Sequence, residues 1–146
     1  SVTQNRLVGF FRACEELGLE IPEEYVRESV FHNPDRCALD TQALMSLPNR
    51  PSCILFPDDY SYVGGMNVLR QMGIGIPEDV SVMGMDGLPI GDYLVPQLTT
   101  VAQSVSSMAQ RSVEILMDGI ENGAQCRHET IPFRIYRRES VRELQD

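Results

Sequence analysis

The feature that most constrains the fold is a regular alternation of helix-like and strand-like segments along all 146 residues. Residues 2–17 and 105–120 place apolar side chains at three- and four-residue spacing, which predicts amphipathic helices. The short apolar runs at 52–56 and 80–85 are typical of strands buried on both sides. Strands that alternate with helices predict an α/β fold, with an open parallel sheet covered by helices on both faces.

Turn and capping residues set the expected boundaries of the elements. A turn that begins at Asn33 leads into a helix at 36–45, and Asp58 or Asp59 can cap a helix that runs to residue 72. Gly18 and Gly73 follow the first and third expected helices and are typical stops. Ser104 is expected to cap the helix at 105–120, which has Gly119 and Gly123 near its end. The expected strands lie at 25–31, 52–56, 80–85, 98–102 and 131–136. The chain opens on a helix, whereas a unit of this kind normally opens on a strand.

Charge and composition exclude several classes of function. The net charge is −9, and the chain has no lysine, so all 12 basic residues are arginine. DNA affinity comes largely from cationic side chains, so this acidic chain is not expected to bind nucleic acid itself. The absence of lysine excludes Schiff-base chemistry and a Walker-type phosphate loop. No apolar run approaches the roughly 20 residues that cross a bilayer.

The four cysteines indicate a reducing compartment. Cys14, Cys37, Cys53 and Cys126 form no Cys-x-x-Cys pair and show no zinc-ribbon spacing. We therefore expect reduced thiols that act as small apolar side chains, no metal site and no cofactor. A cytoplasmic location fits this pattern best.

Carboxylates follow two of the expected strands. Asp58 and Asp59 come after the run at 52–56, and Asp86 comes after the run at 80–85. The carboxyl ends of parallel strands form the ligand-binding edge of such sheets, so these acids are candidates for ligand contact. They can accept hydrogen bonds from sugar hydroxyls, hold a divalent metal or act as acid–base groups. Helix capping by Asp58 or Asp59, and a turn at Asp86, remain the structural alternatives.

Motifs that would indicate an enzyme are missing. The sequence has no Gly-x-Ser-x-Gly elbow, no His-x-x-x-His pair and no glycine-rich dinucleotide loop. Its two histidines are His32 and His128. We therefore expect no enzymatic activity.

Five blocks of the sequence resemble the LacI/GalR family of transcriptional regulators. Residues 76–87 (IPEDVSVMGMDG) resemble the family signature VPxDVSVxGFDD, and residues 96–103 (PQLTTVAQ) resemble PxLTTVxQ. Residues 58–64 match NDxxAxG in spacing. Two short blocks, 6–10 (RLVGF) and 138–140 (RES), resemble RxxGF and the closing RES. The blocks occur in family order and span nearly the whole chain.

The resemblance implies part of an effector-binding core with two subdomains, like that of periplasmic binding proteins. Residues 1–102 would form the C-terminal subdomain without its first strand. Residues 103–126 would be a crossover helix belonging to the N-terminal subdomain, 127–141 a returning strand, and 142–146 a fraying tail. The expected partners are a small-molecule effector, such as a sugar, and a second subunit in a homodimer. Operator DNA would be bound only through a headpiece that is not in the chain.

The same resemblance implies the residues of an effector site. The implied contacts are Arg6, Phe31, Asp58, Asp86 and Gln103, with His32 an alternative to Phe31. Asp58 stands where the family usually has Asn, and Gly87 replaces the second aspartate of the usual pair. A sugar has hydroxyls at its rim and an apolar C–H face for an aromatic ring, which suits this set.

Three further interpretations follow from the sequence. The helix at 59–72 offers a dimer surface at Tyr62, Met66 and Leu69, unless these side chains pack only within the domain. A transport-type binding protein of similar fold is the main alternative, although the blocks at 80–87 and 98–103 favour the regulator. A metal-dependent enzyme that uses Asp58, Asp59 and Asp86 is the third.

Overall fold

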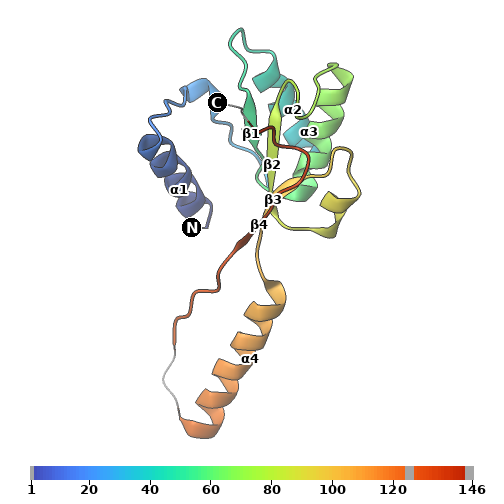
Figure 1. The fold of residues 1–146 in the computed structure, drawn as a ribbon. Helices are drawn as coiled ribbons and strands as arrows, with labels where there is room; N and C mark the ends of the chain where they lie inside the picture. Colours follow the sequence, from blue (N-terminus) through green and yellow to red (C-terminus); the bar gives the residue numbers. More distant parts are fainter. Residues whose placement is uncertain (1, 124–126, 144–146) are drawn as a thin grey trace.

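The computed structural model describes residues 2–123 and 127–143, and it confirms the alternation of helices and strands (Figure 1). The helices are α1 (Val2–Glu16), α2 (Pro34–Met45), α3 (Asp59–Gln71) and α4 (Val105–Asn122), with the 3-10 turns η1 (Glu23–Tyr25) and η2 (Pro89–Asp92). The strands are β1 (Cys53–Leu55), β2 (Ser81–Asp86), β3 (Thr99–Ala102) and β4 (Arg134–Tyr136). Among these residues, no helix has the length and apolar character needed to cross a bilayer.

The four strands form one mixed sheet in the order β1-β2-β3-β4. The first three are parallel, and β4 runs antiparallel to β3. The helices α2 and α3 pack together on one side of the strands, and α1 lies on the other side (Figure 1). The predicted α/β class is confirmed, and the expected all-parallel sheet is corrected by the antiparallel β4.

The core lies between the sheet and α3. Five apolar side chains among the described residues have no exposed surface, namely Tyr62, Leu69, Val80, Val82 and Leu98. Close contact of α2 and α3 depends on Gly64, because a Cβ there would lie 1.9 Å from the Pro34 carbonyl oxygen. Tyr62 and Leu69 therefore pack within the domain and have no surface to offer a partner subunit, whereas Met66 is partly exposed.

The predicted strand at 25–31 is wrong. Tyr25 ends η1, and residues 26–30 have no regular secondary structure. A strand exists only beside a hydrogen-bonded neighbour. Within the described residues, β1 is the edge strand and pairs only with β2.

The edge position of β1 also corrects its expected burial. Ile54 is buried, but Leu55 is 40% exposed and Cys53 is exposed as well. The apolar run at 52–56 therefore has one covered face and one open face.

The helix α4 projects away from the rest of the molecule together with the segment that returns to β4 (Figure 1). It ends at Gly123, which adopts a left-handed conformation. None of its described side chains is buried, so its apolar face is open. The expected Ser104 cap is not made, because the Ser104 hydroxyl bonds the Ser107 hydroxyl and no backbone N–H.

The segment after β4 is attached to the sheet through Ser140. The buried Ser140 hydroxyl donates to the Val82 carbonyl and accepts from the Thr99 N–H, so it joins β2 to β3. Arg142 then donates its N–H to the Ser81 hydroxyl, so the expected fraying does not begin at this residue. Residues 144–146 and Cys126 lie outside the described residues.

Candidate functional site

Three elements meet at the side chain of Arg6. Its position on α1 brings one guanidinium nitrogen to 3.5 Å from a carboxylate oxygen of Asp86, at the end of β2. A second nitrogen donates to the Pro57 carbonyl at 3.4 Å, in the loop between β1 and α3. Both charged side chains keep about a quarter of their surface exposed, 26% each. The guanidinium therefore still has donors that a ligand can reach.

An aromatic ring completes this cluster. The Arg6 guanidinium carbon lies 5.7 Å from the ring centroid of Phe31, which is the range of a cation–π contact. Phe31 is 43% exposed. The structure thus brings together three of the sequence-predicted residues, Arg6, Phe31 and Asp86, and gives them donors, acceptors and an apolar face.

The end of β2 is a tightly shaped turn. Asp86 has φ of 99°, and the next residue, Gly87, has φ of 72°. A Cβ on Gly87 would lie 2.4 Å from the Cβ of Ala102 on β3. Glycine is therefore required after Asp86, which explains why a second aspartate is absent there.

Asp58 is fully buried at the N-terminus of α3. One carboxylate oxygen accepts the Ser61 N–H at 2.7 Å, and the other accepts the Ser61 hydroxyl at 2.8 Å and the His32 N–H at 3.0 Å. Burial alone would raise the pKa of this carboxyl, but the hydrogen bonds from His32 and Ser61 outweigh it and place the pKa below the ordinary value. Asp58 therefore acts as the helix cap, and its effector contact stays a prediction.

Asp59 is also fully buried, and it accepts hydrogen bonds from β3 and from the turn after β2. One oxygen accepts the Thr100 hydroxyl at 2.7 Å, and the other accepts the Leu88 N–H at 2.7 Å. Here burial outweighs the hydrogen bonds, and the nearby Asp86 charge adds to it, so the pKa of Asp59 is raised. Asp59 thus links α3 to β3 and to the turn after Asp86.

Gln103 lies beside this cluster without a described bond to it. It follows Ala102, the register partner of Asp86, and its side chain is exposed at the start of the connection to α4. Sequence reasoning missed Tyr60, whose ring lies edge-on to the His32 ring at a centroid distance of 6.3 Å. Its place in the first turn of α3, directly after two aspartates, is the signal that could have found it.

A metal centre has no support in the geometry. Within residues 2–123 and 127–143, no group of three or more His, Cys, Asp or Glu side chains is placed to hold a metal ion. The oxygens of Asp58 and Asp59 accept hydrogen bonds from the protein itself. The arrangement as a whole is suited to hydrogen bonding of a polar ligand at Arg6 and Asp86.

Comparison with protein families identifies the chain. Residues 1–141 match the model of the periplasmic binding protein-like domain. The chain is 32% identical over 145 residues to the HTH-type transcriptional repressor PurR of Vibrio cholerae, covering 97% of this chain and 42% of that protein. The chain belongs to the periplasmic binding protein-like effector domains of LacI-type regulators. It spans less than half the length of the curated relatives that it matches.

Other relatives agree with this assignment. The ribose operon repressor of Haemophilus influenzae is 33% identical over 122 residues, covering 84% of this chain and 36% of that protein. A LacI-type regulator from Bacillus cereus subsp. cytotoxis superposes with a TM-score of 0.87 at 25% identity, covering 97% of this chain and 50% of that one. A sugar-binding LacI-family regulator from Escherichia coli, complexed with phosphate, gives 0.85 at 27% identity, covering 93% and 49%. The curated relatives are transcriptional repressors and not enzymes.

Proposed function

We propose that this chain senses a sugar or similar polyol as part of a DNA-binding transcription regulator. The observation that carries the proposal is the cluster of Arg6, Phe31 and Asp86. Its guanidinium donors, carboxylate acceptors and aromatic face are complementary to the hydroxyls and the C–H face of a sugar ring. Two relatives point the same way, since one is named a ribose operon repressor and another a sugar-binding regulator.

The second half of the effector site is proposed to lie outside this chain. In this proposal residues 1–102 form one subdomain, 103–126 cross to a second subdomain, and 127–141 return. The exposed apolar face of α4 supports this division, because Val113, Leu116 and Ile120 are each 59–68% exposed, and open apolar patches mark interaction surfaces. Gln103, at the start of the crossover, would then contact the effector from the connection.

The proposed mechanism is a linkage between effector binding and subunit arrangement. An effector held between two subdomains stabilises the relative orientation that it binds best. That orientation would set how a homodimer presents its DNA-binding parts, which lie outside this chain, to operator DNA. Met66, partly exposed on α3, is the candidate for the dimer contact. The parent protein would act in the cytoplasm.

A calorimetric panel tests this proposal. D-ribose, D-glucose, D-galactose and sucrose are titrated into this chain and into the full-length protein. We expect saturable binding of at least one sugar to the full-length protein, and weaker binding to this chain because it supplies one wall of the site. Absence of binding to either protein would overturn the sugar proposal, and equal affinity would overturn the two-walled site.

A further inference from the structure

Two adjacent carboxylates at the start of α3 hold two different turns. Asp58 accepts the backbone N–H of His32, which follows Phe31 directly. Asp59 accepts the backbone N–H of Leu88, two residues after Asp86. The described contacts of Arg6 are with Pro57, Asp86 and Phe31, and each aspartate holds a turn that carries one of the groups around Arg6.

Both turns are strained. Among the described residues, only two other than glycine have positive φ, and they are His32 at 54° and Asp86 at 99°. Such backbone costs roughly 1–3 kcal/mol and persists only where surrounding contacts enforce it. In the first turn, the strained residue His32 itself donates to Asp58. In the second turn, the strained residue Asp86 lies two positions before Leu88, which donates to Asp59.

The bonding around the second turn is denser than one contact. The Thr100 hydroxyl donates to Asp59 and accepts the Gly87 N–H at 3.3 Å, while Asp59 accepts the Leu88 N–H. The N–H groups of Gly87 and Leu88 are therefore both held by the linked side chains of Thr100 and Asp59. At the first turn, Ser61 donates twice to Asp58, which leaves the carboxylate fixed as it accepts from His32.

We propose that Asp58 and Asp59 are positioning residues, each of which enforces one strained turn, so that together they fix the Phe31 ring and the Asp86 carboxylate around the Arg6 guanidinium. A carboxylate suits this role because its two oxygens can cap the helix or bond a core hydroxyl and still accept a bond from a turn. The inference rests on the proposed function only in that Arg6, Phe31 and Asp86 are taken as the effector contacts. The tests below use no ligand, so they can support or overturn this inference even if no sugar in the panel binds.

The role of Asp58 is tested with a variant that keeps its helix-capping bond to Ser61 and removes its bond to His32. Serine is an equally good N-cap, but its shorter side chain cannot also reach the His32 N–H. In Asp58→Ser we expect the Ser61 amide to stay protected in hydrogen exchange measured by NMR, and the His32 amide to exchange about tenfold faster or more, the effect of losing a bond of about 1.4 kcal/mol. Nuclear Overhauser contacts between the Phe31 ring and the Arg6 side chain should weaken. Unchanged His32 exchange with unchanged Phe31–Arg6 contacts would overturn the proposal.

A glycine background tests the strain itself. Glycine adopts positive φ without cost, so in His32→Gly the turn no longer needs enforcing. The unfolding midpoint should therefore fall more on adding Asp58→Ser to His32→Gly than on adding it to the wild-type chain, because only in the wild type does relaxation of the strained turn offset part of the lost hydrogen bond. Equal falls in the two backgrounds would contradict the enforcement of strain by Asp58.

The role of Asp59 is tested with a removal and a conservative replacement. Asp59→Ala removes the acceptor for Leu88 and Thr100, and the Leu88 amide should lose its protection. Asp59→Asn keeps an oxygen for Leu88 and an amide donor for the Thr100 hydroxyl, so it should restore that protection. Ser140→Ala is the matched control, because it also removes two buried hydrogen bonds but acts at Val82 and Thr99. Protection of Leu88 retained in Asp59→Ala, or lost equally in Ser140→Ala, would overturn the positioning role.

Discussion

The lobe, formed by α2, α3 and strands β1 to β3, differs sharply from the arm, formed by α4 and residues 127–133. Both contain a helix with an apolar face, but only the lobe covers it. Leu69 of α3 has no exposed surface, whereas Leu116 of α4 is 61% exposed. The same sequence pattern thus predicts a helix in both places and does not distinguish a closed core from an open face.

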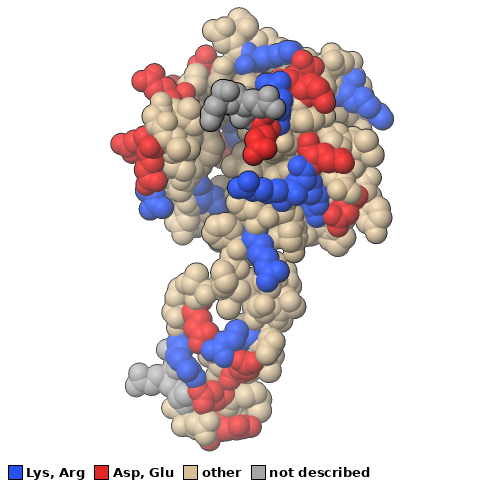
Figure 2. All heavy atoms as spheres, viewed as in Figure 1, with Lys and Arg blue, Asp and Glu red and all other residues tan. Residues whose placement is uncertain are grey.

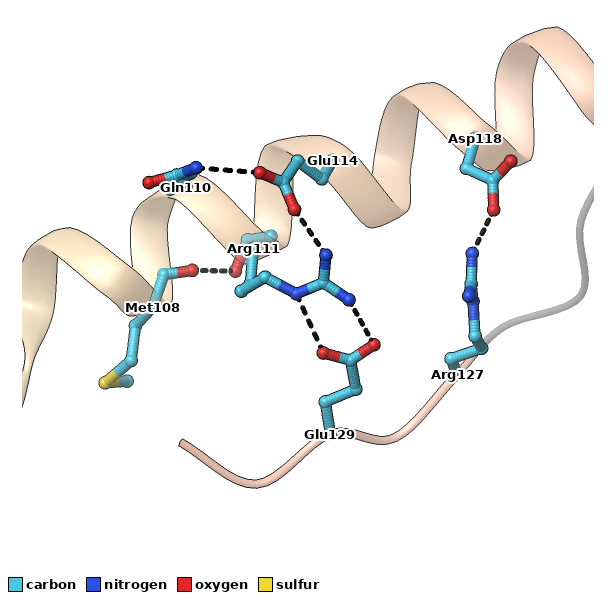
Figure 3. A network of polar contacts seen from close by, with 8 residues as sticks. Met108, Gln110, Arg111, Glu114, Asp118, Arg127 and Glu129 are labelled. Atoms are coloured by element: carbon cyan, nitrogen blue, oxygen red, sulfur yellow. Dashed lines mark hydrogen bonds and ion pairs between the residues drawn. The ribbon is translucent and has the colours of Figure 1, made fainter. Parts of the chain in front are cut away.

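In the arm, the contacts between α4 and the returning segment include ion pairs between exposed side chains. Arg111 on α4 binds both carboxylate oxygens of Glu129 on the returning segment and also reaches Glu114, and Arg127 reaches back to Asp118 (Figure 3). Acidic and basic side chains gather along the arm in the space-filling view (Figure 2). Exposed ion pairs contribute little to stability. The arm therefore lacks the burial that stabilises the lobe, and its ion pairs do not replace it.

A matched pair of leucine substitutions should give the largest difference between the two regions. Leu69→Ala leaves a cavity in the lobe and should lower the free energy of unfolding by about 2–5 kcal/mol. Leu116→Ala removes a side chain that packs against little and should change it hardly at all, since alanine is also a good helix former. Urea unfolding of both variants checks this, and similar losses would show that the arm is packed in solution.

A smaller loss is expected where the lobe is closed by Ser140. Ser140→Ala removes the hydroxyl that joins the Val82 carbonyl to the Thr99 N–H, and leaves both buried groups without it. The free energy of unfolding should fall by about 1–3 kcal/mol. Thermal and urea unfolding measure the loss, and a neutral result would mean that the closing segment does not hold β2 to β3.

Removal of one hydroxyl should stabilise the lobe slightly. The Tyr62 hydroxyl is buried and has no hydrogen-bond partner among the described residues, and burial raises its pKa. Tyr62→Phe keeps the edge-on contact with Phe56, at 5.0 Å between ring centroids, and removes the unpaired group. We expect a gain of about 1 kcal/mol in urea unfolding. A loss of stability would indicate a partner for this hydroxyl.

The smallest effect is expected in the arm. Arg111→Gln removes both of its ion pairs, yet the unfolding midpoint should move by no more than the error of the measurement, because these groups are exposed. A fall as large as that of Ser140→Ala would mean that the ion pairs support the fold.

Local signals predicted most of the fold. Asp58 does cap α3, and the turn at Asn33 does lead into α2, because caps and turns depend on a few neighbouring residues. The cap expected at Ser104 is not made, since its hydroxyl bonds the Ser107 hydroxyl. The strand predicted at 25–31 failed, because a strand needs a pairing partner that no local pattern reveals. The open face of β1 could not be predicted for the same reason, because a local pattern does not show that a strand lies at the edge of a sheet.

The candidate site was predictable only in part. Arg6, Phe31 and Asp86 lie 25 or more positions apart in the sequence, and only the family resemblance connected them before the structure was known. The cap at Asp58 was foreseen as an alternative to ligand contact. The bond from Asp59 to Leu88 spans 29 positions, and the positive φ of His32 and Asp86 has no sequence signature.

The most direct measurement of the account compares two arginines on α1. Arg6 points at Asp86 and Phe31, whereas Arg12 is largely exposed and pairs only with Glu16 among the described contacts. With the sugar that binds tightest in the panel, calorimetry on the full-length protein should show about tenfold weaker binding or more for Arg6→Ala, the effect of losing charged hydrogen bonds. Arg12→Ala should bind as the wild type does. Equal affinity of the two variants would contradict an effector site at Arg6.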